Sequence, residues 1–241
     1  MRVAWAAQTA DVSWMGRGDE RWRIVKTLDM EAFRATPLVR EPFEYLIVPG
    51  FVKPEARAAV NRDYPVVPDL GSFPLERLQF GAAFKDMVDD LESEDFRKAF
   101  EEKFGIDLTG RPTTITARGR CGTRDGFIHT DSTSKIITVL IYMNNSWEAQ
   151  GGRLRLLKSG SDLEDMIAEV PPVEGTLVCF RRSNNSWHGH KQFIGERRVI
   201  QFNWVTDKSS QKLVALRHTL SIPFKKVMSM VRPQQAKEPV M

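Results

Sequence analysis

Hydrophobic residues recur at two different spacings along this chain. Between residues 82 and 104 they follow helical spacing, which predicts two helices separated near Ser93. From Thr113 onward the spacing changes to short β-prone runs divided by polar turns, at residues 113–118, 136–143, 153–157, 175–180 and 197–205. Many short strands without long helices between them predict an antiparallel sandwich or barrel. The expected fold class is therefore mainly β with flanking helices.

The residues before this β-rich part predict supporting elements. Residues 43–51 are typical of a strand followed by a turn. Pro54 opens a predicted helix over residues 54–62, because proline suits the first helical position. Residues 64–80 are rich in Pro, Gly and Leu and predict a surface loop, and residues 158–169 predict a second loop.

The domain organisation predicted from this pattern is simple. Residues 1–40 are polar and only locally hydrophobic, which predicts an irregular N-terminal arm or short edge strands. We expect a single domain over residues 41–231, with its core at about 113–206, and a disordered tail over residues 232–241.

Composition narrows the class of protein. Hydrophobic residues make up 41% and charged residues 27% of the 241, as in ordinary soluble globular proteins. The net charge of +4 comes from interspersed charges, which does not predict a nucleic-acid partner. Two cysteines do not make a disulfide scaffold, and they favour a cytoplasmic location. The N-terminal apolar run is too short to predict a signal peptide, and no apolar run is long enough to predict a transmembrane helix.

A possible metal site begins at the sequence Gly-Phe-Ile-His-Thr-Asp, residues 126–131. In a strand, His129 and Asp131 share one face, because successive side chains alternate. His188 is the candidate third ligand, and two histidines with one carboxylate form the facial triad of non-haem iron(II) oxygenases. Taken separately, His129 is better explained as a hydrogen-bonded core imidazole and Asp131 as a turn cap. Their combination with His188 favours the metal site. His190 competes with His188 for the third position.

The ordered set of motifs resembles the iron(II)- and 2-oxoglutarate-dependent oxygenases, most closely their prolyl-4-hydroxylase-like branch. It comprises His-X-Asp, a distant Trp187-His188 and an arginine about ten residues later, within a similar stretch of sequence from about Ile115 to Trp204. The resemblance implies a double-stranded β-helix, the jelly-roll or cupin-like barrel. It also implies iron(II), 2-oxoglutarate and O2 as cofactor and cosubstrates, with ascorbate as a candidate reductant. Related halogenases lack the carboxylate, so Asp131 favours hydroxylation or desaturation.

Strand alternation separates the two neighbouring arginines that could bind 2-oxoglutarate. Arg198 shares a face with the apolar residues at 200, 202 and 204, whereas Arg197 lies on the opposite face. If the apolar face points into the barrel, Arg198 is the buried arginine that meets the distal carboxylate of 2-oxoglutarate. The alternative is a structural salt bridge. The resemblance places Tyr142 beside the same carboxylate, with an ordinary aromatic core position as the alternative. It places Leu154 in the cosubstrate pocket, where a plain core role explains this residue equally well.

The substrate is the least determined part of the prediction. Arg118, Arg120, Trp187 and His190 are candidate substrate contacts, and the arginines suggest an anionic substrate, although exposed arginines are common. We expect a small molecule or biosynthetic intermediate. The alternatives are a protein hydroxylase of the prolyl type and a noncatalytic sensor of metal or oxoacid on the same fold.

The C-terminal residues 213–231 have a basic amphipathic pattern. Phe224, Val227, Met228 and Val231 recur at helical spacing among Lys225, Lys226 and Arg232. Such a segment could contact a membrane surface, pair with a second subunit or pack on its own barrel.

Overall fold

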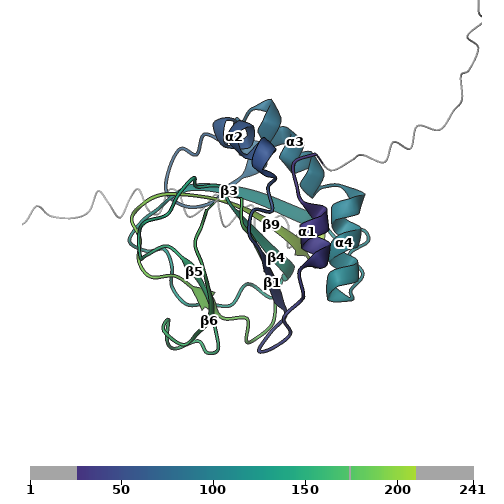
Figure 1. The fold of residues 1–241 in the computed structure, drawn as a ribbon. Coiled ribbons are helices and arrows are strands. Elements are labelled where there is room, and N and C mark those ends of the chain that lie inside the picture. The colour runs from purple at the N-terminus through teal and green to yellow at the C-terminus, as the bar shows by residue number, and fades with distance from the viewer. Residues whose placement is uncertain (1–25, 174, 210–241) are drawn as a thin grey trace, which may run out of the picture.

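A long antiparallel sheet forms the centre of the computed structural model, which describes residues 26–173 and 175–209 (Figure 1). Its strand order is β1-β7-β4-β9-β3-β2. The bounds of these strands are β1 Tyr45–Val48, β2 Phe73–Pro74, β3 Thr113–Cys121, β4 Lys135–Tyr142, β7 Leu177–Arg181 and β9 Gly195–Val205. A smaller sheet has the order β6-β5-β8, with β5 at Leu154–Leu157, β6 at Met166–Val170 and β8 at His188–Gly189. All the strand pairs are antiparallel, which confirms the predicted mainly β class.

The α-helices of the described residues pack on one face of the large sheet (Figure 1). They are α1 Met30–Ala35, α2 Pro54–Arg62, α3 Ala82–Leu91 and α4 Glu94–Phe104, and a short 3-10 helix, η1, spans Leu75–Arg77. The predicted separation near Ser93 is confirmed, because the Ser93 hydroxyl accepts a hydrogen bond from the backbone N–H of Phe96 and caps α4. Gly105 ends α4 with a φ of 62°, the left-handed conformation that glycine adopts without strain.

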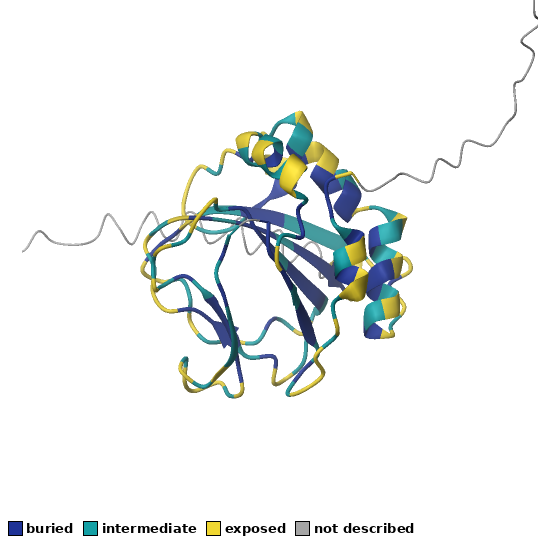
Figure 2. Ribbon diagram, in the orientation of Figure 1, coloured by how far each residue is buried: buried dark blue, intermediate teal, exposed yellow. Residues whose placement is uncertain are grey.

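An aromatic core joins the helices to the large sheet. Phe100 of α4 stacks on Phe33 of α1 with 4.5 Å between ring centroids, and lies 4.9 Å from Trp204 of β9. Phe96 contacts both Phe202 and Trp204. Figure 2 shows this pattern as helices that are buried towards the sheet and exposed on the outside. The most apolar face of β9 is therefore covered by helices.

A second, smaller core lies between the two sheets. Phe180 and Val199 of the large sheet pack there with Leu154 and Leu156 of the small sheet, and Tyr142 is fully buried among them. The large sheet is thus covered on both faces, which explains the nearly continuous apolar run of β4.

Three local predictions were wrong. Residues 30–35 form α1 instead of part of an irregular arm, because Met30 and Phe33 are buried against the other helices. Residues 64–80 contain β2 and the 3-10 helix, with Phe73 and Leu75 buried, so they are more than a surface loop. Residues 166–170 form β6, whose pairing with β5 is supported by an ion pair between Glu169 and Arg155.

Two further predictions fall on residues that the structure does not describe. These are the basic amphipathic segment at 213–231 and the disordered tail at 232–241. Within the described ranges, every helix is too short or too polar to cross a membrane.

Candidate active site

His129, Asp131 and His188 meet at one end of the space between the two sheets. The backbones of His129 and His188 are paired through two reciprocal N–H···O hydrogen bonds, each of 3.0 Å. Asp131 follows two residues after His129. One ligand atom from each of the three residues lies within 4.8 Å of the others. This spacing brings the three predicted ligands to one point from two segments that are far apart in sequence.

Backbone carbonyls fix which nitrogen each imidazole presents. His129 Nδ1 lies 2.8 Å from the Phe127 carbonyl, and His188 Nδ1 lies 3.0 Å from the Ser186 carbonyl. A carbonyl can only accept, so in both rings Nδ1 carries the hydrogen and Nε2 keeps its lone pair. Histidines that bind metals usually donate their other ring N–H to a carbonyl or carboxylate in this way. The two rings are therefore oriented as metal ligands.

The charge state of the cluster also suits a divalent cation. Burial opposes ionisation of Asp131, but Lys135, His188 and the hydrogen bonds from Lys135 and Thr138 together hold its pKa below the usual value. Lys135 Nζ lies 2.8 Å from one carboxylate oxygen, and Thr138 donates to the other at 2.5 Å. Burial lowers the pKa of His188 to about 4, which keeps its imidazole neutral. Two imidazoles and one carboxylate fit the donor set of non-haem iron(II).

A cavity of about 440 Å³ adjoins this cluster. Its wall includes polar groups from the large sheet and loops, together with the apolar side chains of Leu140, Leu154 and Val199. The three candidate ligands line it together with Lys135, Thr138, Tyr142, His190 and Arg197. A cavity of this size can hold a small molecule, and the many polar and charged side chains on its wall favour a polar ligand.

Arg197 extends into this cavity from β9. Its side chain donates from Nε to the Gly152 carbonyl at 2.8 Å and from Nη2 to the Tyr142 hydroxyl at 3.3 Å. The guanidinium also lies over the Tyr142 ring, 5.1 Å from its centroid. The residue is only 5% exposed, yet no carboxylate among the described residues lies within ion-pair distance of it. A buried guanidinium without an anion is costly, so the cavity favours an anionic ligand.

The structure corrects the prediction that Arg198 is the inward-facing arginine. Arg198 is 35% exposed, pairs with Glu196 at 2.7 Å and lies over the ring of Tyr64. Strand alternation correctly placed Arg197 and Arg198 on opposite faces, but the apolar face of β9 packs against the helices and not into the barrel. Arg197, nine positions after His188, therefore occupies the place predicted for Arg198.

Tyr142 and Leu154 line the cavity as predicted, beside Arg197. Tyr142 is fully buried, and burial raises the pKa of its phenol, so the hydroxyl stays protonated and can donate to a ligand. Gly152 is the second of two consecutive glycines, at residues 151 and 152. Its φ is 78°, and a Cβ there would meet the Trp147 ring at 2.6 Å. Because glycine has no side chain, the backbone at residue 152 can come close enough for its carbonyl to accept from Arg197 and orient that side chain.

The predicted substrate residues divide into two groups. His190 and Arg118 line the cavity, but Arg118 is neutralised by Asp125 at 2.7 Å. Arg120 is exposed on the outer side near Arg198, and Trp187 packs against Gly160, so both lie outside the cavity. His190 is not one of the clustered metal-ligand candidates.

Some cavity residues had no assigned role in the sequence analysis. Thr138 donates to Asp131, and Gln201 shares the inward face of β9 with Arg197. Their inward position follows from strand alternation once the helix-covered face is known.

Comparison with known proteins agrees with this geometry. Residues 120–206 match the family described as the 2OG-Fe(II) oxygenase superfamily. The chain resembles that superfamily over this region. Its members are oxidoreductases that use Fe(II), 2-oxoglutarate and O2, so the resemblance seen in the sequence is confirmed. No curated protein sequence matches the chain.

Several solved structures are similar to this chain at low sequence identity. A prolyl hydroxylase from Trichoplax adhaerens, solved with a peptide fragment of hypoxia inducible factor, is 18% identical with a TM-score of 0.50, covering 70% of this chain and 86% of its own. A Pseudomonas putida prolyl-4-hydroxylase is 17% identical, with a TM-score of 0.48 and coverage of 68% and 92%. AviO1 from Streptomyces viridochromogenes is 15% identical, with a TM-score of 0.42 and coverage of 75% and 96%. The Trichoplax likeness supports the double-stranded β-helix of this superfamily.

Proposed function

We propose that this protein is an iron(II)- and 2-oxoglutarate-dependent dioxygenase that hydroxylates an unactivated C–H bond of a small molecule. The observation that carries the proposal is the guanidinium of Arg197, which has no carboxylate partner among the described residues and lies in the same cavity as the cluster of His129, Asp131 and His188. The cluster suits a divalent metal, and the guanidinium suits an anion. A dicarboxylate cosubstrate that chelates the metal at one end satisfies both.

Each group has a defined part in this proposal. His129 and His188 bind iron through Nε2, and Asp131 binds through its carboxylate. Arg197 and the Tyr142 hydroxyl hold the distal carboxylate of 2-oxoglutarate by charge-assisted hydrogen bonds. Leu154 and Val199 form the apolar wall beside its methylene groups. When bound, the iron, with 2-oxoglutarate and O2, supplies the oxidation, coupled to decarboxylation of 2-oxoglutarate to succinate and CO2.

Lys135 and Thr138 position the carboxylate ligand. Both donate to Asp131, and Lys135 compensates its charge. Contacts of this kind commonly change metal affinity by about 10–100-fold when removed. Their function in this proposal is to hold Asp131 ionised and in one rotamer.

The cavity supports a small substrate. At about 440 Å³ it must contain both 2-oxoglutarate and the group to be oxidised. Arg118 is already paired with Asp125, which leaves the exposed Arg124 at the rim as the candidate contact for an anionic substrate. His190 presents a second polar group, with Nδ1 held 2.8 Å from the Lys191 carbonyl.

An anaerobic titration with iron(II) and 2-oxoglutarate tests the site directly, by following the visible charge-transfer band of the metal chelate. We expect the band in the wild-type protein and its loss in His188→Ala. Arg197→Ala should need far more 2-oxoglutarate, whereas the neighbouring Arg198→Ala should titrate like the wild type.

Two outcomes would contradict the proposal in different ways. If Arg198→Ala weakens 2-oxoglutarate binding and Arg197→Ala does not, the arginine assignment is wrong. If no band forms in folded, iron-loaded protein, the proposed reaction class is wrong. If the band does form, succinate formation with candidate substrates, together with a product mass increase of one oxygen, distinguishes an enzyme from a noncatalytic sensor.

A further inference from the structure

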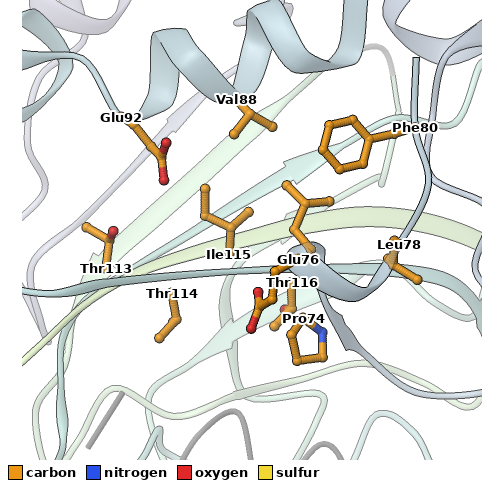
Figure 3. Close-up of a pocket in the computed structure, with 11 residues that line it drawn as sticks. Pro74, Glu76, Leu78, Phe80, Val88, Glu92, Thr113, Thr114, Ile115 and Thr116 are labelled. Carbon is orange, nitrogen blue, oxygen red and sulfur yellow. The ribbon is translucent and has the colours of Figure 1, made fainter. Parts of the chain in front are cut away.

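A groove of about 500 Å³ lies between α3 and the outer edge of β3, away from the candidate active site (Figure 3). Val88 and Phe80 lie on one side of it and Ile115 on the other, as Figure 3 shows. Leu75 and Leu78 extend this apolar surface. Two carboxylates, Glu76 and Glu92, border it, and within the described ranges neither has an ion-pair partner. The groove is therefore apolar in its floor and acidic at its border.

Among the described residues, the edge of β3 beside this groove is only partly paired with another strand. The two-residue strand β2 pairs only with Ala117 and Thr116, so no described strand pairs with that edge at Thr114 and Ile115. Thr116 is only 3% exposed, and its hydroxyl has no hydrogen-bond partner among the described residues. Proteins usually cover or pair such an edge, because free backbone groups on an apolar edge invite association.

A second depression of about 410 Å³ continues the groove towards the end of β9. The two share Glu92 and Thr113, and the second is also lined by Glu94, Arg111 and Trp204. The chain leaves β9 at this place, since the Val205 N–H donates to the Pro112 carbonyl and Arg111 donates to the Thr206 carbonyl. The residues after Thr206 therefore start beside the groove.

The sequence after β9 complements the groove in charge and pattern. Residues 213–232 contain four Lys or Arg residues and no Asp or Glu. Phe224, Val227, Met228 and Val231 recur at a spacing that places them on one side of a helix. Burial, followed by the neighbouring Asp89, raises the pKa of Glu92, and a nearby cation would relieve that cost.

We propose that residues 213–232 dock in this groove of their own chain. The apolar stripe contacts Ile115, Leu78 and Phe80, and the lysines at 225 and 226 meet the carboxylates of Glu76 and Glu92. Lys208 and Ser209 are helical, so the six residues between Thr206 and Leu213 can span about 16 Å when the other four are extended. The four residues of β3 that line the groove span about 13 Å, so the connection is long enough.

Carbodiimide crosslinking of the full chain tests this proposal, because it joins only carboxylates and amines in direct contact. We would use an equal mixture of isotope-labelled and unlabelled protein. The expected result is links from Lys225 or Lys226 to Glu76 or Glu92 within chains of one isotope. Val227→Asp should abolish these links, whereas Ser229→Asp, which adds the same charge off the apolar stripe, should keep them.

Hydrogen exchange at residues 113–116 gives a second readout. Exchange should be faster in Val227→Asp than in wild type and unchanged in Ser229→Asp, and an intact iron and 2-oxoglutarate band would show that both variants are folded. Links that combine the two isotopes would overturn the proposal in favour of a second copy of the chain. Links that avoid Glu76 and Glu92, with exchange that is the same in all three proteins, would also overturn it.

Discussion

The two faces of β9 show how one strand serves both stability and chemistry. The outer face carries Ile200, Phe202 and Trp204, which pack against the helices in an aromatic core. The inner face carries Arg197, Val199 and Gln201, which line the cavity. The outer face is the more apolar one because it is sealed, whereas the inner face must keep polar groups available for a ligand. Polarity on a buried face therefore indicates the functional side.

The largest effect on stability is expected from the outer face. Phe100→Ala removes a ring that contacts Phe33 and Trp204, and such truncations cost about 3–5 kcal/mol in the free energy of unfolding. Denaturant unfolding measures this loss. The folded fraction should bind iron and 2-oxoglutarate with wild-type affinity, because the ring lies on the helix side. Phe100→Leu provides a milder variant if the alanine form does not fold. A changed affinity for iron or 2-oxoglutarate in that variant would contradict the separate roles of the two faces.

The inner face should show the opposite behaviour. Replacing Arg197 by Met removes a buried charge that has no anion partner among the described residues, so the ligand-free protein should lose little stability. Binding of 2-oxoglutarate should weaken by about 2–5 kcal/mol, or roughly 30-fold or more. Calorimetry with iron-loaded protein measures the affinity, and Arg198→Met is the matched control. Equal effects from both variants would contradict the assignment of faces.

The sequence predicted much of the fold because its local signals were strong. Pro54 opens α2 and Ser93 caps α4 as expected, and the strands begin or end within a few residues of the predicted runs. The α1 helix was missed because six residues carry too little periodicity, although Phe33 is fully buried. The β6 strand was missed because most of its residues are only partly buried.

The candidate site shows a different limit. His129, Asp131 and His188 were recognised from motif order, and the structure brings them together. That they bind iron stays a prediction. The arginine was misassigned because strand alternation tells which residues share a face but not which face is covered by helices. That information lies in the packing of residues 82–104 on β9, a tertiary contact that the local pattern does not contain.

The pH dependence of stability tests the environment of His190, which lines the cavity. Burial, and then the charge of Arg197, lowers the pKa of His190 from 6.5 to about 4. The unfolded chain therefore binds a proton between these values that the folded protein does not, so stability falls as the pH decreases from about 6.5 to about 4. The His190 contribution to this loss is on the order of 2 kcal/mol.

His190→Asn removes this titration while His188 remains in both proteins. Unfolding free energies of metal-free wild type and variant, measured at pH 7 and pH 4.5, should show a smaller loss in the variant. Parallel pH profiles would mean that His190 is not held neutral by the cavity.

The smallest effect is expected for the hydroxyl of Tyr142. Tyr142→Phe keeps the ring under Arg197 and removes only the group that accepts from Nη2 at 3.3 Å. The loss of one hydrogen bond to a bound carboxylate should weaken 2-oxoglutarate binding by about 1–2 kcal/mol, less than the loss of the guanidinium. The double variant Tyr142→Phe with Arg197→Met should bind only slightly less tightly than Arg197→Met alone, because the two groups act on one carboxylate and the hydroxyl is oriented by the arginine. Fully additive losses in the calorimetric affinities would mean that the two groups contact different parts of the ligand, and the shared carboxylate site would have to be abandoned.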